Sequence, residues 1–470
     1  MWSRSEQVQA YRFLTRRIGS AVLSGEPETN ELPMRRFALA VFGSAALAGL
    51  VFAGFAVYGL LRPAGRQPVA NSIIVERETG AKYIFIEGLL HPVLNWTSAR
   101  LILAQPKPPV RTMAQSSLRD VPRGRPVGIP DAPDALPGRD GLVGAPVSVC
   151  SAPRSATSVD PASHVLVGRA PAGGTPLGPA EGLLVSTGDG GAARYLLWRS
   201  HRLRVRDNAT LAALGWAAVR PARVGVAFLN AVPPGPDLAP PELPDAGEPA
   251  RVPVGGDAAE VGDMFRAADK FYVMLRDGLA PVGDVTARLS VAGGAPVTEI
   301  TAREAGQVLV KTAAEPPGFP ADVPAARGAG DGAAMACAVY RAEGGAEQPA
   351  AVETFAGVDP DFALSPERAA PARPGADGVL TADRVTLPGG HAALVSAANA
   401  PGAVYLVTDQ GLKHPLPAAD ADKVRASLGY EGVRPVAVPS IVLALVPTAA
   451  ALDPDAATQL APPPTVAPGG

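Results

Sequence analysis

The sequence predicts an α+β protein with one N-terminal transmembrane helix and an elongated extracytoplasmic domain of four small β-rich repeats. Three observations predict it: an uncharged apolar stretch at 37–61, a strand–turn–strand pattern that begins at a tyrosine four times, and two cysteines at matching places in two halves of the chain. We expect the repeats to lie around a central β layer. The two halves should be related by a pseudo-two-fold axis and joined by one disulfide.

Composition limits the class of protein. The chain has 470 residues, of which 47% are hydrophobic and only 5% aromatic, and its formal net charge is −2. The residues after the apolar stretch are numerous enough for more than one core. Glycine and proline number 51 each, which indicates short elements and many turns. Because no basic region dominates, the charge balance argues against a nucleic-acid partner.

Residues 1–36 form a basic leader with the pattern of an amphipathic helix. Ser3 and Glu6 have the spacing of a capping box, and Gly25 is a stop signal. Apolar residues recur between them at helical spacing: Val8, Tyr11, Leu14, Ile18 and Val22. The helix either rests on the inner membrane surface or a partner, or is an ordinary solvated basic helix. We favour the first alternative because the apolar stripe needs cover.

Residues 37–61 are predicted to be the transmembrane helix. They contain no charged residue and no Asn or Gln, and a helix of this length would be about 37 Å long, enough to cross a membrane. A cleaved signal peptide has an apolar core of only about 7–15 residues near its start, so we expect an uncleaved anchor. A flank of small residues is the candidate contact with other subunits: Gly43, Gly49, Gly54 and Gly59. No GxxxG dimer motif is inferred from Gly49 and Gly54, which are five apart.

Internal repetition organises the rest of the chain. Four segments begin at Tyr83, Tyr195, Tyr272 and Tyr405 and have the pattern of β-hairpins: YIFIEGLLHPV, YLLWRSHRLRV, YVMLRDGLAPV and YLVTDQGLKHPL. Short helices follow some of them, as at 207–215 and 418–429. The tyrosines are interpreted as structural. We predict four α+β repeats, at 62–108, 181–236, 250–312 and 381–452.

The repeats also match in pairs. The second contains LGWAAVRP at 214–221 and the fourth contains LGYEGVRP at 428–435. The first and third share TSARL at 97–101 and TARL at 286–289. Agreement at so many positions indicates two similar halves, each composed of a repeat, a central segment and a second repeat.

The cysteines follow the same scheme. Cys150 lies in the central segment 109–180, 67 residues after Tyr83 (150 − 83), and Cys337 lies in the segment 313–380, 65 residues after Tyr272 (337 − 272). Matching places in two halves meet near a pseudo-two-fold axis, which favours a disulfide there over two buried free thiols. A bridge closing so long a loop would contribute roughly 5 kcal/mol in loop-entropy models.

Flanking charge does not decide the topology, because three arginines precede the span within twenty residues and three follow it. The cysteine pair is more informative, since disulfides persist in oxidising compartments. We therefore expect a plasma (inner) membrane protein with a cytoplasmic N-terminus and an extracytoplasmic C-terminal domain. Residues 453–470 are a Pro/Ala-rich tail and are predicted to be disordered.

A search for catalytic, cofactor and metal sites finds no motif. The fragment Gly306 to Thr312 lacks the second glycine of a phosphate-binding loop, and no G-x-S-x-G occurs. Five histidines are scattered without metal-ligand spacing. His91 and His414 each precede a proline at the same hairpin position, as a repeated ligand contact or, as we favour, a structural turn residue.

Several of these features together resemble EccB, the family of core membrane subunits of type VII (ESX) secretion systems of actinobacteria. They are the leader MWSRSEQVQAYRFLTRRIGSAVL, the single span, the four repeats, the cysteine pair and GVAFLNAVPPGPDL at 225–238. The resemblance implies assembly with EccC, EccD and EccE subunits, self-association through the extracytoplasmic domain, a Cys150–Cys337 disulfide and a conceivable cell-wall contact.

The resulting functional hypothesis is a scaffold subunit of an inner-membrane secretion complex. Two alternatives stay open. One is an ATP-hydrolysing component with a non-Walker site, since some family members are described as ATPases, and ATP is a cofactor only under this alternative. The other is a membrane anchor that binds the cell wall. Because no phosphate-binding motif is found, we assign ATP hydrolysis to the EccC partner.

Overall fold

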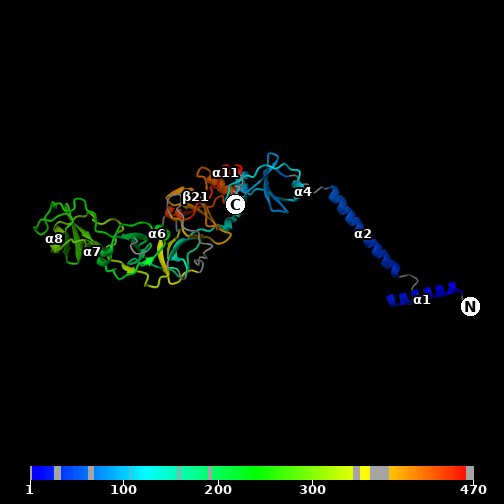
Figure 1. The fold of residues 1–470 in the computed structure, drawn as a ribbon, viewed down its shortest axis with the longest axis horizontal. Coiled ribbons are helices and arrows are strands. Elements are labelled where there is room, and N and C mark those ends of the chain that lie inside the picture. Colours follow the sequence, from blue (N-terminus) through cyan, green and yellow to red (C-terminus); the bar gives the residue numbers. More distant parts are fainter. Residues whose placement is uncertain are drawn as a thin grey trace, which may run out of the picture. The chain divides into compact units, whose positions relative to one another are not determined.

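The structure is a computed structural model of the 470-residue chain (Figure 1). It describes residues 3–25, 33–61, 68–105, 107–155, 158, 160–188, 193–341, 350–359 and 380–461. The chain divides into two compact units. One comprises residues 1–69, 76–80 and 112–121, and the other, called the body here, comprises the rest.

The leader forms helix α1 (Arg4–Ser24). The backbone N–H of Ser3 donates to the Glu6 carboxylate at 2.8 Å, as expected of a capping box. Gly25 adopts the left-handed conformation (φ 71°), and its N–H donates to the carbonyl of Ala21, which ends the helix. The predicted start and stop signals therefore act where the sequence places them. The apolar stripe is exposed, with Tyr11 72% and Val22 80% accessible.

The apolar stretch forms helix α2 (Pro33–Leu61), which begins four residues before the predicted span. Proline suits the first helical position because it has no N–H to lose. The 22 residues Phe37–Tyr58 have the length and hydropathy of a membrane-crossing helix, and none of that segment is buried. The described residues contain one such helix.

Four units of the chain share one element order, strand–strand–strand–helix–strand–helix. The first contains β1 (Ile73–Glu76), β2 (Lys82–Ile86), β3 (Leu89–Pro92), α3 (Trp96–Leu103), β4 (Val110–Met113) and α4 (Gln115–Leu118). The second contains β8 (Glu181–Ser186), β9 (Arg194–Trp198), β10 (His201–Val205), α5 (Asn208–Ala213), β11 (Ala222–Arg223) and α6 (Val226–Ala231). The third contains β12 (Met264–Ala267), β13 (Lys270–Leu275), β14 (Gly278–Val282), α7 (Asp284–Ala292), β15 (Val297–Glu299) and α8 (Ala302–Gln307). The fourth contains β20 (Ala392–Ala397), β21 (Ala400–Thr408), β22 (Lys413–Pro415), α9 (Ala421–Ser427), β23 (Val436–Val438) and α10 (Ser440–Ala444). We call them repeats 1 to 4.

The four sheets also share one strand order. In each sheet the third strand pairs with the second, the second with the first, and the first with the fourth. The first three strands run antiparallel, as a hairpin meander, in all four repeats. The fourth strand is parallel to the first in repeats 2, 3 and 4, because a helix carries the chain back across the sheet. The predicted α+β fold with β-rich repeats is confirmed.

A central sheet joins the two halves. Its strands are β5 (Val147–Pro153), β6 (Pro161–Val167), β7 (Thr175–Pro176), β17 (Met335–Tyr340), β18 (Ala351–Phe355) and β19 (Arg384–Thr386), in the order β19-β6-β5-β17-β18-β7. The two middle strands are the cysteine strands of the two halves. Each edge strand pairs with a strand of the opposite half, so the predicted pseudo-two-fold arrangement about a central β layer is present in the strand order.

The hydrophobic cores of the body also join the two halves. One core lies between the central sheet and helices α6 and α10 of repeats 2 and 4. A second core joins repeat 2 to repeat 3, where α5 contacts α7, and a third joins repeat 4 to repeat 1, where α9 contacts α3. Each outer repeat therefore packs on an inner repeat of the other half.

The structure differs from the predicted boundaries in three places. Strand β4 extends repeat 1 beyond residue 108, and β19 belongs to the central sheet although it lies within 381–452. The tail predicted to be disordered contains helix α11 (Pro454–Thr458), which packs on α3, so that prediction is wrong for residues 453–461. Its Pro/Ala composition masked a helix start, in which the Asp453 side chain accepts from the N–H of Asp455 and Ala457 is fully buried. Residues 462–470 lie outside the described residues.

Candidate functional site

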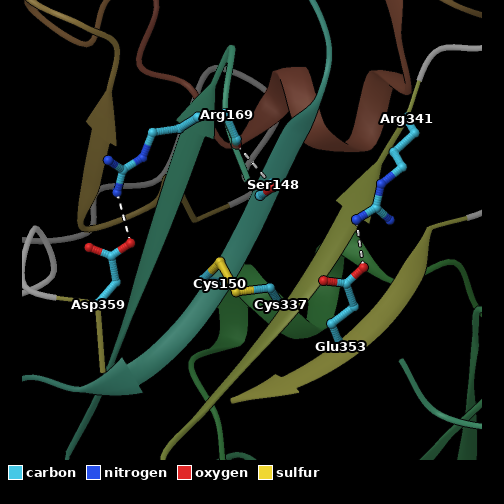
Figure 2. Close-up of a disulfide and its surroundings, with 7 residues drawn as sticks. All are labelled: Ser148, Cys150, Arg169, Cys337, Arg341, Glu353 and Asp359. Carbon is cyan, nitrogen blue, oxygen red and sulfur yellow. Dashed lines mark hydrogen bonds and ion pairs between the residues drawn. A yellow bond between two sulfur atoms is a disulfide. The ribbon is translucent and has the colours of Figure 1, made fainter. Parts of the chain in front are cut away.

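The cysteine pair lies at the middle of the central sheet (Figure 2). Cys337 on β17 is the direct antiparallel partner of Cys150 on β5, and both are fully buried. Their sulfurs form a disulfide with an S–S distance of 2.04 Å. The predicted bridge is therefore present, and it closes a loop of 187 residues between the two halves. With both cysteines bridged, no free thiol is left for nucleophilic chemistry.

Charged side chains flank the disulfide on the same sheet (Figure 2). Glu353 is the strand partner of Cys337, is 6% exposed, and pairs with the Arg341 guanidinium at 2.7 Å. Arg169 pairs with Asp359 at 2.9 Å, and its backbone carbonyl accepts a hydrogen bond from the Ser148 hydroxyl. The buried carboxylate of Glu353 therefore has a cation beside it, as burial of a charge requires.

His164 is the strand partner of Cys150 on the other side of the bridge. It is 2% exposed, and burial lowers its pKa to about 4, partly opposed by the nearby Asp383 carboxylate. Asp383 pairs with Arg154 at 2.6 Å and accepts the N–H of Ser163 at 2.8 Å. The imidazole is therefore neutral at physiological pH and acts as part of the packing.

The four repeat tyrosines occupy one position, in the second strand of each repeat. In repeats 1, 3 and 4 each lies opposite a proline of the third strand, while Tyr195 lies opposite Arg204. Tyr83 carries the guanidinium of Arg123 over its ring at 4.7 Å. Tyr83 is buried, and the other three are partly buried against neighbouring hydrophobic cores. A structural role for all four remains our interpretation.

His91 and His414 are equivalent in the structure as well. Each lies in the third strand of its repeat, and its Nδ1 is 3.0 Å from a backbone carbonyl, that of Arg125 or Ala450. A carbonyl only accepts, so this nitrogen carries the proton. His414 is fully buried, and burial lowers its pKa. Both contacts fix local segments of backbone, which supports the structural interpretation.

The small-residue flank of α2 is unoccupied by other parts of the described chain. A Cβ added at Gly43, Gly49 or Gly54 would meet nothing within 4 Å. Gly59 lies in α2, but its surroundings are outside the described residues. The flank is therefore open to another helix, and its role as a subunit contact remains a prediction.

Two aromatic anchors were not predicted as functional from the sequence, although they lie in the paired LGWAAVRP and LGYEGVRP motifs. Trp216 in repeat 2 is 4% exposed, and its indole N–H donates to the carbonyl of Pro324 at 3.2 Å. Tyr430 in repeat 4 is fully buried, and its hydroxyl donates to the carbonyl of Pro137 at 2.9 Å. Burial raises the pKa of Tyr430 to about 12, which keeps the hydroxyl a donor. Each anchor holds the central segment of the opposite half.

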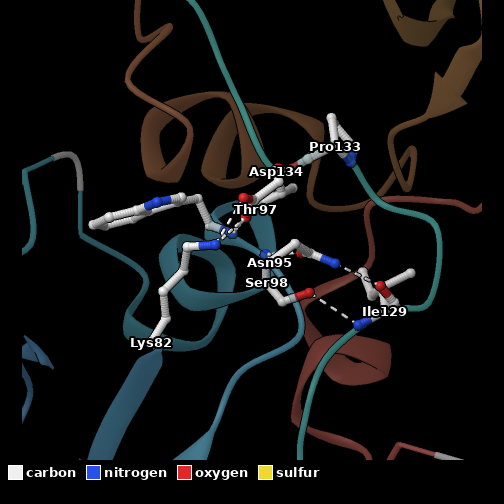
Figure 3. Close-up of polar contacts among 8 residues, drawn as sticks. Lys82, Asn95, Thr97, Ser98, Ile129, Pro133 and Asp134 are labelled. Carbon is white, nitrogen blue, oxygen red and sulfur yellow. Dashed lines mark hydrogen bonds and ion pairs between the residues drawn. The ribbon is translucent and has the colours of Figure 1, made fainter. Parts of the chain in front are cut away.

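The central segment that follows repeat 1 is also fixed to helix α3 (Figure 3). The Asn95 amide donates to the carbonyl of Ile129 at 2.8 Å, and the N–H of Ile129 donates to the Ser98 hydroxyl at 2.9 Å. Lys82 pairs with Asp134 at 2.7 Å. Asn95 is at the same time the N-cap of α3, because its side chain accepts the N–H of Ser98. The N-terminus of α3 and the segment that crosses it are therefore joined by hydrogen bonds.

The fragment that resembled part of a phosphate-binding loop has the wrong architecture for one. Gly306 lies inside α8, and Lys311 follows after the helix has ended, whereas such a loop precedes the helix whose N-terminus binds phosphate. The described residues contain no cluster of three potential metal ligands. Two clefts of about 280 Å³ each lie in the body, one beside β5 and β17 and one beside Trp198. Both are below the roughly 300–1,000 Å³ typical of small-molecule sites.

These features define a class of protein: a candidate membrane-spanning helix followed by a disulfide-linked body of four equivalent repeats. The family model described as "Type VII secretion system ESX-1, transport TM domain B" matches residues 2–461. The chain therefore belongs to the EccB family, and the resemblance noted from the sequence is confirmed.

Curated relatives and solved structures agree with the family. The chain is 30% identical over 462 residues to the ESX-3 secretion system ATPase EccB3 of Mycolicibacterium smegmatis, which covers 93% of this chain and 86% of that relative. It is 31% identical over 314 residues to EccB3 of Mycobacterium tuberculosis, covering 60% of this chain and only 55% of that relative. An EccB3 dimer from the ESX-3 core complex superposes with a TM-score of 0.64 at 28% identity, covering 83% of this chain and 100% of that one. A chain of an intact ESX-5 inner membrane complex, at 23% identity, shares the fold with a TM-score of 0.65 and covers 100% of this chain and 98% of that one.

Proposed function

We propose that this chain is a scaffold subunit of the inner-membrane core complex of a type VII secretion system. The observation that carries the proposal is the family match over residues 2–461, which includes both the membrane-length helix and the whole described body. A scaffold must hold a fixed shape between membrane and partners. The disulfide, the exchanged edge strands and the reciprocal anchors give this body that property.

The proposed topology places residues 1–36 in the cytoplasm, 37–61 in the membrane and the body outside. Support comes from the buried Cys150–Cys337 disulfide, because such bonds persist in oxidising compartments. A buried disulfide in the body with the opposite orientation would face cytoplasmic reductants. Labelling of full-length protein in intact cells with a membrane-impermeant reagent, at Thr458→Cys outside and Ser5→Cys inside, tests the orientation. Labelling of Ser5→Cys alone would reverse it.

The proposed partners are EccC-, EccD- and EccE-like subunits and a second copy of the chain. The solved relatives are described as an EccB3 dimer and as parts of ESX inner membrane complexes, which supports both kinds of partner. The exposed Gly/Ala flank of α2 is the surface we assign to subunits within the membrane. Disulfide or reagent cross-links from Gly49→Cys or Gly54→Cys should reach neighbouring subunits, and cross-links only to lipid would contradict this assignment.

The experiment that tests the scaffold itself is mild detergent extraction followed by native mass spectrometry. We expect the chain in a complex of several different membrane subunits. Recovery of only free monomer would contradict the proposal and favour an anchor that acts alone, such as one that binds the cell wall.

An ATP-hydrolysing role is the second candidate, because curated relatives carry the word ATPase in their names. ATP turnover should be measured with purified full-length protein, Lys311→Ala and, as a matched exposed control, Lys270→Ala. Turnover abolished by Lys311→Ala but not by Lys270→Ala would replace the scaffold-only proposal. We expect no turnover above background in any of the three proteins.

A further inference from the structure

Repeat 1 exposes an unusual surplus of positive charge. Between residues 68 and 127 the sequence has eight basic and four acidic side chains. Lys107, Arg111 and Arg125 are exposed, and none of them pairs with a carboxylate among the described residues. Arg123 is exposed as well and lies over the ring of Tyr83. The surplus is therefore not consumed by ion pairs within the body.

Repeat 3 shows that the same fold does not need this surplus. Residues 250–312 contain seven basic and eight acidic side chains. Most of the arginines there form ion pairs, three of them inside the repeat and one with Asp245 just before it: Arg251–Asp277, Arg266–Glu299, Arg288–Asp284 and Arg276–Asp245. The two repeats share topology but differ in net charge, which is +4 (8 − 4) in residues 68–127 and −1 (7 − 8) in residues 250–312, so the fold itself does not require the surplus of repeat 1.

Repeat 1 also has exposed apolar side chains. Val110 precedes Arg111 on β4 and is 52% exposed, and Leu94 and Leu89 are 44% and 36% exposed. A mixture of free cations and shallow apolar side chains is typical of protein surfaces that contact phospholipid head groups. An anionic protein partner would require only the positive charges and would not account for the exposed apolar side chains.

Repeat 1 is connected to the membrane-length helix by a short segment of chain. Eleven residues, 62–72, connect the end of α2 at Leu61 to the start of β1 at Ile73. Even fully extended they span at most about 40 Å. Repeat 1 is the repeat directly connected to α2, and repeat 3 is separated from it by the rest of the first half. The surplus charge therefore belongs to the repeat that directly follows the membrane-length helix in the chain.

We propose that repeat 1 rests on anionic phospholipid head groups of the membrane that α2 spans, through Lys107, Arg111, Arg123 and Arg125. Each such cation near an anionic surface contributes severalfold to the bound population, and the contact weakens as salt shortens the Debye length. The proposal rests on α2 spanning a membrane but does not depend on assembly with other subunits. It can therefore fail while the scaffold function stands, and the reverse is also possible.

The test uses full-length protein in nanodiscs of phosphatidylcholine alone or with phosphatidylglycerol, followed by hydrogen–deuterium exchange of peptides that cover residues 107–125. We expect about tenfold slower exchange in the phosphatidylglycerol discs, lost at high salt. The variant Lys107→Glu/Arg111→Glu/Arg125→Glu should abolish the difference. Lys270→Glu/Arg303→Glu/Lys311→Glu changes the charge of repeat 3 by the same amount at exposed positions and should leave the difference unchanged.

Equal exchange in the two kinds of disc would overturn the proposal, whether the peptides are protected in both or in neither. Equal loss of protection in both triple variants would also overturn it, because net charge alone would then explain the effect. Thermal unfolding of each variant in the same discs verifies that the body is folded. If the repeat 1 variant unfolds, the salt dependence and lipid dependence of the unchanged protein still decide the question.

Discussion

The two halves of the body repeat one layout, but different side chains join them. The cysteines are 187 residues apart, and so are Pro137 and Pro324, each 13 residues before its cysteine. Tyr430 of the second half binds the carbonyl of Pro137, and Trp216 of the first half binds that of Pro324. The carbonyls that accept these bonds therefore lie at equivalent positions in the two halves, whereas the side chains that donate to them differ.

The polar contacts around these shared positions differ more. The residue opposite Cys150 is His164, and the residue opposite Cys337 is Glu353. The strand β16 (Ala325–Arg327) adds to the sheet of repeat 2, but its counterpart in the other half makes only a single bridge, between Leu142 and Ala392. Strand order and buried anchors are therefore shared by the two halves of the duplicated fold, while the polar contacts around them differ.

Removing the disulfide should lower the stability of the body more than any other change proposed here, because the bridge lies where the halves meet. We expect Cys150→Ala/Cys337→Ala to lower the free energy of unfolding by up to about 5 kcal/mol, since the loop it closes is 187 residues long. Denaturant unfolding followed by circular dichroism measures the loss. A loss below about 1 kcal/mol would show that sheet pairing alone joins the halves.

The two anchors should be nearly equivalent and rank next. Tyr430→Ala and Trp216→Ala each remove a buried aromatic ring and should cost about 3–5 kcal/mol of unfolding free energy. Tyr430→Phe isolates the hydroxyl bond to Pro137 and should cost about 1 kcal/mol, because the carbonyl is left unpaired. Equal losses in the two alanine variants support equivalent halves. A loss confined to one variant would show that only one half is anchored.

The sequence predicted the architecture well because the duplicated motifs recur at nearly equal spacings in the two halves. Tyrosine hairpins, the VRP motifs and the cysteine positions were sufficient to place the repeats, the central layer and the disulfide. What it could not predict depends on contacts between distant segments. Neither the bonds from Trp216 and Tyr430 to proline carbonyls nor the exchanged edge strands leave a local pattern. Helix α11 was missed because a short Pro/Ala segment gains its stability from packing on α3 rather than from its own propensity.

The His164 position should make the first half of the central sheet acid-sensitive. Burial lowers the pKa of His164 to about 4, against an ordinary value of 6.5 in the unfolded chain. The neutral form is favoured by folding, so this stability is fully present above pH 6.5 and is lost as the pH falls through about 4. The shift corresponds to about 3 kcal/mol.

Unfolding free energies measured between pH 7 and pH 4 test this expectation. His164→Gln should remove most of the slope, with a smaller slope remaining because burial also lowers the pKa of His414. His201→Gln, at an exposed hairpin position, is the control for the substitution itself. An unaltered slope in His164→Gln would assign the acid sensitivity elsewhere.

The smallest expected difference concerns one arginine in each outer repeat. Arg100 in α3 donates to the carbonyl of Leu428 at the end of α9, 2.8 Å away, and so joins repeat 1 to repeat 4. Its counterpart Arg288, in the shared TARL motif, instead pairs with Asp284 one turn away on its own helix. The position of Asp284, four residues before the arginine, is taken by Trp96 in repeat 1, which has no charge to hold the arginine locally.

Arg100→Ala should therefore cost about 1.5 kcal/mol of unfolding free energy, as expected for a charged donor on a helix-terminal carbonyl. Arg288→Ala should cost only about 0.3 kcal/mol, because an exposed pair four residues apart on one helix contributes little. Trp96 packs against the core of repeat 1 and cannot be changed cleanly, so Asp284→Asn is the informative third variant. If the local carboxylate is what keeps Arg288 on its own helix, Arg288→Ala in the Asp284→Asn background should cost more than in the original chain. An equal cost in both backgrounds would mean that the geometry of the repeat 2–repeat 3 contact, rather than Asp284, prevents the second half from forming the same bond.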